Sequence, residues 1–586
     1  MGIDWEKAEK EEVLEQVIKD FTSAETARKP REDMWRRWYK LYRSYVETKK
    51  QGSNIFVPYV FSIIETVLPK LMSVLFNVRP YIGVLATKPS EVASAKAQEE
   101  LIDYQLTQQM PFKEIMASWI KEALMLGTSI LKVGWEYEEG EYITTEPILE
   151  IFGMSVGERL VKEEGVIKDD PLIEHIDLWD FYISPFAKNV QESPYAIHKM
   201  YTNLEHLKEM EKLGIYEDIN EVEKSLASQA YETGVSVRQS DIGLQDAEKP
   251  EEEIELLEYW TDARVITVAN RAVVIRNNEN PYYHRRKPFI RLVDVIVPHE
   301  FYGIGEIEPI EHLQHEFNTL RNQRIDNLNL IINRMWKVLR GADIDAKQLV
   351  SRAGGIVELD DMSDIEELVM KDVTNSAYIE ADTVKRDMDN ANGVFDYARG
   401  ETTDRRETAT TAAILSTAAS ERFQLKISLI EDMGLKELGR QLGALNQQFI
   451  TTDRMVRLQG DHGYEFKEIP PERIRGQFDY MALGSAVHPV INKENRLTSF
   501  INLYNMLKDS PHINHAELLK RILELADIKD VDSILVDNSE QAMMQQLFGN
   551  LTEEEVMAME MGEDEAMLES PPNVQEGVMD NERGFY

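Results

Sequence analysis

Cysteine is absent from the 586-residue sequence. Its absence excludes disulfide bonds, thiolate catalysis and cysteine-based zinc sites, and it fits a chain that assembles in a reducing cytoplasm. Basic residues are also scarce, since 65 Lys and Arg stand against 105 Asp and Glu, for a formal net charge of −40. This balance argues against a broad basic surface for binding nucleic acid, because such surfaces neutralise phosphates with Lys and Arg. Any contact with nucleic acid must be local or weak.

The common motifs of catalysis and nucleotide binding are missing. The sequence contains no G-x-x-x-x-G-K-[ST] phosphate loop, no G-x-S-x-G nucleophile elbow and no H-E-x-x-H zinc motif. The stretch GIGEIE, Gly303–Glu308, lacks the third glycine of a dinucleotide-binding fingerprint. The residues therefore identify no nucleophile, acid or base, and we expect neither catalytic residues nor a cofactor or metal.

One pattern keeps a metal-dependent hydrolase open as the alternative. His312 and His315 occupy adjacent turns of a predicted helix, beside Glu311 and Glu316. Histidine and glutamate at such spacing can share a metal ion. The charged outer face of a long helix shows the same pattern.

A long apolar run, Phe56–Phe76, could be mistaken for a membrane span. It carries Glu65 and Lys70 near its centre, together with Pro58 and Pro69. Each charge would cost about 2.5–3.5 kcal/mol at the middle of a bilayer. We therefore predict a buried pair of helices punctuated by proline and no contact with a membrane, with a peripheral membrane scaffold as a third interpretation.

The length predicts several packed regions, because single domains rarely exceed roughly 250–300 residues. Near the N-terminus, Trp35, Trp38, Tyr42 and Tyr45 recur at steps of three and four, which places them on one helix face. We interpret this face as an anchor packed on the body rather than a platform for stacking bases. Helical patterning covers about Ser90 to Leu126, with a break at Pro111. Residues 127–297 are mostly strand-like and broken by Gly and Pro.

Three long helices are predicted in the second half of the chain. The first, Pro309–Leu339, would be about 45 Å long, with polar Arg324 interrupting its apolar stripe. The second runs over residues 376–395. The third runs from Asp404 to Thr451, because Asp404 and Glu407 have the spacing of an N-cap and its reciprocal partner. In its second half, Leu438, Leu442, Leu445 and Phe449 repeat at steps of four and three, which places them on one helix face.

A short loop before the third helix gathers positive charge in this acidic chain. Arg399, Arg405 and Arg406 surround Gly400 within residues 396–406. Sparse guanidinium groups on a loop can touch a passing polyanion and release it, whereas dense positive charge would bind it tightly. We therefore interpret the loop as facing a polymer rather than a small substrate.

The order of these segments resembles the portal proteins of tailed bacteriophages, the head-to-tail connectors. Three stretches carry the local similarity: NIFVPYVFSIIETVLPKLMSVLFNVRP, HIDLWDFYISPFAKNVQESPYAIHKMYTNLEHL and GVFDYARGETTDRRETATTAAILSTAASERFQLKISLIEDM. The resemblance covers roughly Asn54 to Asp527. It implies an α+β, predominantly helical subunit that forms a ring, usually of twelve copies.

The family's regions transfer to this chain as expected boundaries. They are an N-terminal helical anchor at 1–53, a wing of helices and a strand-rich lobe at 54–300, a first stem helix at 301–340, a clip at 341–374, a second stem helix at 375–395, a tunnel loop at 396–406, a long wing helix with return strands at 407–490, a crown at 491–548 and an acidic flexible tail at 549–586.

The resemblance also implies a function. The ring would sit at one capsid vertex of the virion, after assembly in the host cytoplasm, and pass double-stranded DNA during packaging and ejection without reading its sequence. Its partners would be the terminase large subunit, a head-tail adaptor and the major capsid or scaffolding protein. Arg399, Gly400, Arg405 and Arg406 would line the DNA channel, although these arginines could instead pair with carboxylates of a neighbouring subunit.

Overall fold

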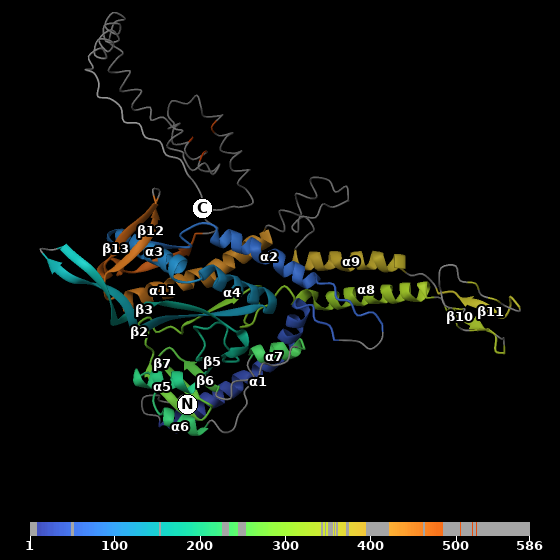
Figure 1. Cartoon of the computed structure of the whole chain (residues 1–586), viewed down its shortest axis with the longest axis horizontal. Helices are drawn as coiled ribbons and strands as arrows, with labels where there is room; N and C mark the ends of the chain where they lie inside the picture. The colour runs from blue at the N-terminus through green and yellow to red at the C-terminus, as the bar shows by residue number, and fades with distance from the viewer. Residues whose placement is uncertain are drawn as a thin grey trace, which may run out of the picture. The chain divides into compact units, whose positions relative to one another are not determined.

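The computed structural model describes residues 9–483 apart from internal gaps, of which the longest are 226–233, 244–252 and 394–420. Beyond 483 it describes only Tyr504, Leu519 and Leu523, so the expected crown and acidic tail lie almost wholly outside the described residues. The chain divides into two units, residues 1–489 and 490–586. The first unit mixes helices and strands, in agreement with the predicted α+β class (Figure 1).

The N-terminal helix α1 (Lys10–Tyr42) is an anchor, as its aromatic face predicts. Trp35 and Trp38 are fully buried in the main core. Arg28 is also buried, and its guanidinium donates to three carbonyl oxygens between residues 178 and 181 at 2.5–3.1 Å. A buried guanidinium needs such acceptors, because an unpaired buried charge is very costly. These bonds fix α1 to the strand-rich lobe.

The apolar run forms a single helix, α2 (Tyr59–Phe76), and not the predicted pair. The helix continues through Pro69, although an interior proline removes one hydrogen bond and costs roughly 3 kcal/mol. Burial on both sides of the proline offsets that cost, since Ile63 and Leu75 are fully buried. By length and composition α2 is the one helix of the described chain that could span a membrane, and 50% of that stretch is buried inside the protein.

Two helices follow in the order that the sequence predicts. Helix α3 (Val92–Tyr104) continues as a π-turn (Gln105–Gln109), and α4 (Phe112–Leu126) begins immediately after Pro111. Proline cannot donate a backbone hydrogen bond, so it ends one helix and suits the start of the next.

The GIGEIE stretch has a packing role. Gly127 ends α4 with a φ of +83°, a conformation that favours glycine. A Cβ atom at Gly127 would lie 2.3 Å from the carbonyl oxygen of Gly303, and one at Gly305 would lie 2.7 Å from the carbonyl oxygen of Leu124. The glycines allow two backbones to touch where α4 turns into the next strand.

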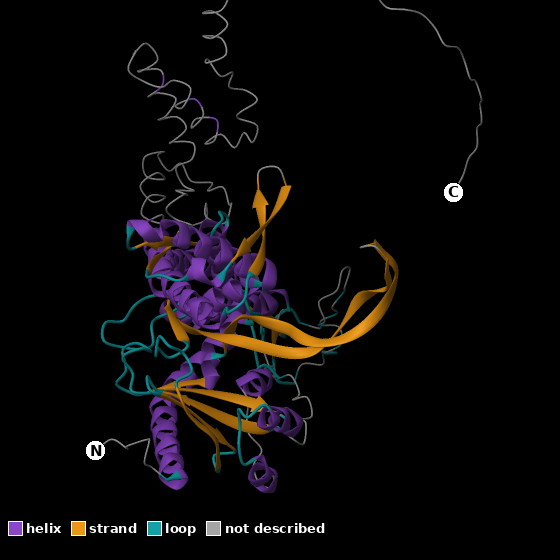
Figure 2. Ribbon diagram, turned by 90° about the vertical axis from the view of Figure 1, so that its left-hand side faces the viewer, coloured by secondary structure: helices purple, strands orange, loops and turns teal. Residues whose placement is uncertain are grey.

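Two antiparallel sheets form the strand-rich lobe (Figure 2). The first has the order β3–β2–β9, with strands β2 (Thr128–Ile151), β3 (Met154–Ile176) and β9 (Phe289–Val293). The second runs in the order β4 (Phe181–Ile183), β5 (Ala196–Thr202), β6 (Ile254–Trp260), β7 (Arg264–Ala269) and β8 (Val273–Glu279). Three short helices accompany it: α5 (Leu204–Lys212), α6 (Ile219–Ser225) and α7 (Gly234–Asp241).

The described part of the third predicted helix is helical over residues 421–430, passes through a π-turn (Glu431–Leu435) and ends in α11 (Lys436–Phe449). The apolar repeat is confirmed here, since Leu438, Leu442 and Leu445 are buried in the main core. Four further strands form two antiparallel pairs: β12 (Arg454–Gly460) with β13 (Gly463–Ile469), and β1 (Ile82–Ala86) with β14 (Phe478–Ala482).

The helix predicted over Pro309–Leu339 is shorter than expected. Helix α8 (Glu311–Ile332) stops at Asn333, and Met335–Val338 instead form strand β10, which pairs antiparallel with β11 (Ile365–Leu368). Twenty-two residues give a helix of about 33 Å. The strand partner lies too far along the chain for helical periodicity to reveal it. Helix α9 (Thr374–Asn392) then returns, close to its predicted range.

Candidate functional site

The two predicted stem helices form a helical rod that leaves the body. Helices α8 and α9 run side by side, and the β10–β11 pair lies at their far end (Figure 1). The rod carries more negative than positive charge, since α8 and α9 together hold seven Asp and Glu against four Lys and Arg. Apolar side chains are exposed towards its far end, among them Ile332, Val338 and Leu339.

A polar row on α8 fixes the segment that precedes α2. Gln314, Asn318, Asn322 and Asp326 recur every four residues and bond to the backbone of residues 53–60. Asn322 makes a paired contact, because its Oδ1 accepts from the N–H of residue 55 at 2.7 Å while its Nδ2 donates to that residue's carbonyl at 3.0 Å. We call residues 53–57 the strap.

The spacing of these bonds follows from elementary geometry. Four residues of an α-helix rise about 6.0 Å, and two residues of an extended chain rise about 6.6 Å. The strap runs antiparallel to the helix, so Ser53, Ile55 and Val57 meet Asp326, Asn322 and Asn318 in turn. The side chains thus supply hydrogen-bond partners to the backbone of a half-exposed segment that belongs to no strand of the described chain.

Arg324, which interrupts the apolar stripe, joins the two rod helices. It is 6% exposed, and its guanidinium carbon lies 3.9 Å from the ring centroid of Tyr378 on α9. A guanidinium over an aromatic ring gains electrostatic attraction together with contact area. The residue that broke the apolar pattern therefore contributes to helix packing.

Side-chain hydrogen bonds hold the residues on either side of the 394–420 gap. Before the gap, Asn392 Nδ2 donates to the carbonyl of Glu306 at 3.0 Å. After the gap, Arg422 Nη1 donates to the carbonyl of Asn390 at 3.2 Å. We use the name loop root for Asn392 and Arg422 together with the cluster of Lys426, Asp294 and Glu306. The residues that border segment 394–420, which contains the arginine loop, are thereby fixed to α9 and to the body.

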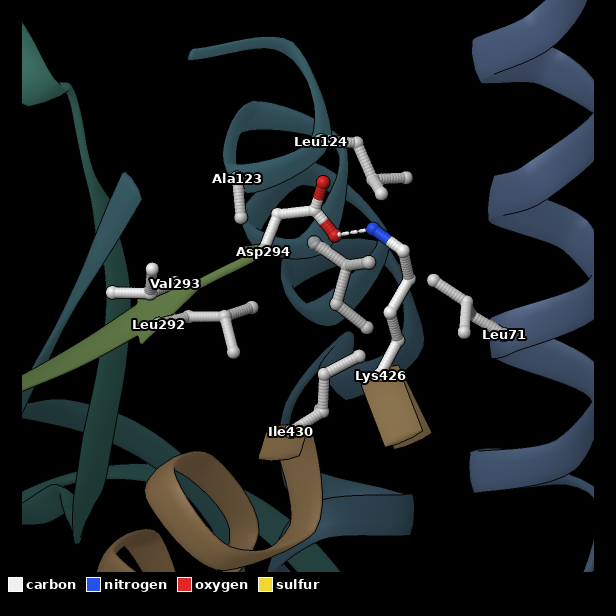
Figure 3. Close-up of a pocket in the computed structure, with 9 residues that line it drawn as sticks. Leu71, Ala123, Leu124, Leu292, Val293, Asp294, Lys426 and Ile430 are labelled. Carbon is white, nitrogen blue, oxygen red and sulfur yellow. Dashed lines mark hydrogen bonds and ion pairs between the residues drawn. The ribbon is translucent and has the colours of Figure 1, made fainter. Parts of the chain in front are cut away.

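A buried ion cluster reinforces the loop root (Figure 3). Lys426 Nζ donates to Asp294 Oδ1 and lies 2.9 Å from Glu306 Oε1. The side chains of Lys426, Asp294 and Glu306 are 15%, 3% and 6% exposed. Apolar side chains from α2, α4 and β9 surround them, and the remaining cavity, about 10 Å³, holds at most one water molecule.

The electrostatics of this cluster follow from burial. Burial raises the pKa of Asp294, and Glu306 raises it further, while the ammonium of Lys426 acts in the opposite direction. For Lys426, burial opposes the charged form, but Asp294 and Glu306 outweigh it and the pKa is raised. The ammonium therefore stays charged and serves two carboxylates, so the loop root depends on one lysine.

The residues of the hydrolase alternative are not assembled into a metal site. His312 and His315 are exposed on α8, and Glu311 is already bonded to Arg37 at 2.7 Å and to Trp38 at 2.8 Å. Among the described residues no group of three His, Cys, Asp or Glu could hold a metal ion. The pattern matches the charged outer face of a helix.

The predicted channel residues, Arg399, Gly400, Arg405 and Arg406, lie outside the described residues. The structure therefore brings together the two helices that flank the loop and the root that holds it. Sequence reasoning missed Lys426, Asp294 and the polar row of α8. The four-residue recurrence of Gln314 to Asp326 was the signal that could have revealed the row.

The helical rod tipped by two strands and the strand-rich lobe agree with the α+β portal-type subunit that the sequence predicts. The chain belongs to the phage SU10 portal protein family, whose family model matches residues 13–149 and 154–561. The resemblance inferred from the sequence is thus confirmed, and the match covers nearly the whole chain. The protein is a phage portal protein, a component of the capsid vertex in a family that is structural rather than enzymatic.

Proposed function

We propose that twelve copies of this chain form a ring at one capsid vertex, and that double-stranded DNA passes along its axis during packaging and ejection. Family membership and the rod of α8 and α9 with strands β10 and β11 at its end support this proposal. In this arrangement the rod helices are the stem and the strand pair belongs to the clip. The wing comprises residues 54–300 and 407–490.

The clip boundary moves slightly in this proposal. The sequence-based range for the clip begins at 341, but β10 begins at Met335 and pairs with β11. The clip therefore includes both strands. Its exposed apolar residues, such as Val338 and Leu339, fit a docking surface for the terminase large subunit and later for the head-tail adaptor. The wing and crown would meet the capsid or scaffolding protein.

A negatively charged channel would keep DNA from adhering to its wall. A ring of twelve chains at −40 would carry about −480, and a lumen of the same sign as DNA repels the phosphates rather than holding them. The acidic excess on α8 and α9 supports such a lumen. Adhesion would act as friction, because every phosphate neutralised adds binding energy.

The arginine loop supplies the few positive contacts. We place Arg399, Arg405 and Arg406 at the narrowest part of the channel, where they touch passing phosphates and release them. The loop root supports this role, since Asn392 and Arg422 fix the residues that border segment 394–420 to the body and to the stem helix α9. The competing role is pairing with carboxylates of the neighbouring subunit.

The ring is tested by imaging the purified full-length protein. We expect negative-stain images to show a ring with an axial hole, and mass photometry to give a mass near twelve times 67.6 kDa. A monomer under all assembly conditions would contradict the proposal.

The loop is tested by Arg399→Ala and Arg406→Ala. We expect both variants to form rings while packaging less DNA or retaining it poorly in an assembly reaction. Arg440→Ala is the matched control, because Arg440 is half-exposed on α11 and pairs locally with Glu437 at 2.6 Å. Loss of rings in the loop variants would instead assign these arginines to subunit pairing.

A further inference from the structure

Strands β2 and β3 continue well beyond the sheet that they help to form. Strand β9 pairs with β2 only over Thr128–Lys132, and further support comes from the packing of Trp135 on Phe449 and the ion pair of Asp169 with Arg454. From the Tyr137–Asp169 pair onwards, β2 and β3 form a two-stranded ribbon (Figure 2). We call residues 137–169 the arm. Its β2 strand, Tyr137 to Ile151, would span about 50 Å if extended.

The arm carries an apolar row on one face. Residues directly opposite in register point to the same side, and the side alternates with each residue along a strand. Ile143 is opposite Lys162, Val166 is opposite Glu139, and Leu160 lies two residues from Lys162 on β3, so Ile143, Leu160 and Val166 share one face. On that face Ile143, Leu160 and Val166 are 67%, 75% and 51% exposed.

Such a ribbon needs a covering surface. A two-stranded hairpin is marginally stable in water by itself, and nothing in the described part of the chain covers these apolar side chains. The arm is also acidic, with nine Asp and Glu against three Lys and Arg over residues 137–169. Charged edges disfavour pairing with a further strand, so the face rather than the edge is the binding surface.

The same chain presents a matching surface elsewhere. Phe186 and Tyr283 are the most exposed aromatic side chains among the described residues, at 93% and 84%, and Lys188 and Arg285 beside them in sequence are exposed. Their two loops are joined through Gln191, whose side chain bonds twice to the backbone of residue 287 at 2.9 and 3.1 Å. We call Phe186, Lys188, Tyr283 and Arg285 the basic aromatic patch.

We propose that the arm of one subunit lays its apolar face on the basic aromatic patch of the next subunit. The proposal rests on the ring proposed above. The arm is acidic and apolar, whereas the patch is basic and aromatic, so the two surfaces complement each other in charge and in apolar character. Two different surfaces of one chain make a head-to-tail contact, which is the kind of contact that builds a ring when the rotation between copies closes. Both surfaces are exposed within a single chain, which leaves them available to a second copy.

The absence of cysteine gives a clean test, because an introduced cysteine is the only thiol. In the ring, Leu160→Cys should react with a maleimide at least about tenfold more slowly than Glu138→Cys, since labelling must wait for the covered face to open. Glu138 is exposed and lies on the opposite face of the arm, and Lys168 is its partner in the strand register. Adding Arg285→Glu to Leu160→Cys should restore fast labelling.

A second measurement identifies the covering surface. A bismaleimide should join Leu160→Cys to Phe186→Cys in the double variant and give covalent dimers and larger multimers. Equal labelling of Leu160→Cys and Glu138→Cys in intact rings would overturn the arm contact and leave the ring standing. Protection of Leu160→Cys only after the capsid or scaffolding protein is added would overturn it as well, by assigning the arm to another protein. If the cysteine-free parent forms no ring, the proposed function fails together with the arm contact.

Discussion

Replacement of Lys426 by Met is the most direct test of the loop root. The change leaves two buried carboxylates, Asp294 and Glu306, without the cation that both contact. Removing one member of a buried ion pair typically costs 3–5 kcal/mol. Burial already raises the pKa of Asp294, so this carboxyl can take up a proton and limit the loss. We therefore expect a cost at the lower end, about 3 kcal/mol.

The sign of the pH dependence follows from the same shift. A carboxyl whose pKa is raised in the folded state favours folding at low pH, and that contribution is lost as the pH rises through the folded value. Without Lys426 nothing offsets the effect of burial on the two carboxylates. The deficit of Lys426→Met relative to the natural protein should accordingly be larger at pH 8 than at pH 5.

Urea unfolding of the full chain, followed by tryptophan fluorescence, measures the cost at both pH values. Hydrogen exchange over residues 421–430 tests whether the loss is local. Lys436→Met is the matched control, because Lys436 is half-exposed with its partner 4.0 Å away, and such a pair contributes at most about 1 kcal/mol. Equal stability of the two variants would refute the reasoning, and adding Asp294→Asn to Lys426→Met should recover part of the loss.

Two further predictions concern the strap and the second sheet. Asn322→Ala removes both bonds to Ile55 and should weaken the strap locally by about 1–2 kcal/mol, measured as faster hydrogen exchange of the Ile55 amide. Asn329→Ala, on the exposed side of α8, is the control and should leave that exchange rate unchanged. His198 is buried, and burial lowers its pKa to about 3. The unfolded chain therefore binds the proton more tightly, and the stability of the natural protein should fall as the pH drops below about 6.5. In urea unfolding, the natural protein should lose about 2 kcal/mol between pH 7 and pH 5 relative to His198→Gln.

Specific outcomes would contradict these two predictions. Unchanged exchange at Ile55 in Asn322→Ala would mean that the strap is held by packing alone. Parallel pH profiles for the natural protein and His198→Gln would mean that His198 is protonated in the folded state or gains access to water.

Much of the fold was predictable because it depends on local periodicity. The face of Trp35 and Trp38 predicted an anchor, the repeat of Leu438 and Leu442 predicted a buried helix, and Pro111 predicted a break. Each of these signals lies within a few turns of chain. The family resemblance also rested on sequence alone, through the order of such segments.

The corrections arise where distant parts of the chain meet. Asn322 bonds to a residue 267 positions away, and Lys426 to one 132 positions away, so no local pattern could identify the partners of these side chains. Helix α8 ends early because strand β11 offers β10 a partner, and α2 continues through Pro69 because both halves are buried.

The sequence by itself determined the sign of the charge, the absence of thiol chemistry and the helical and strand periods, because composition and spacing are properties of the chain alone. Only the tertiary structure decided which polar groups are buried and what satisfies them. A buried donor, acceptor or charge is stable only beside its partner, and three-dimensional packing chooses that partner.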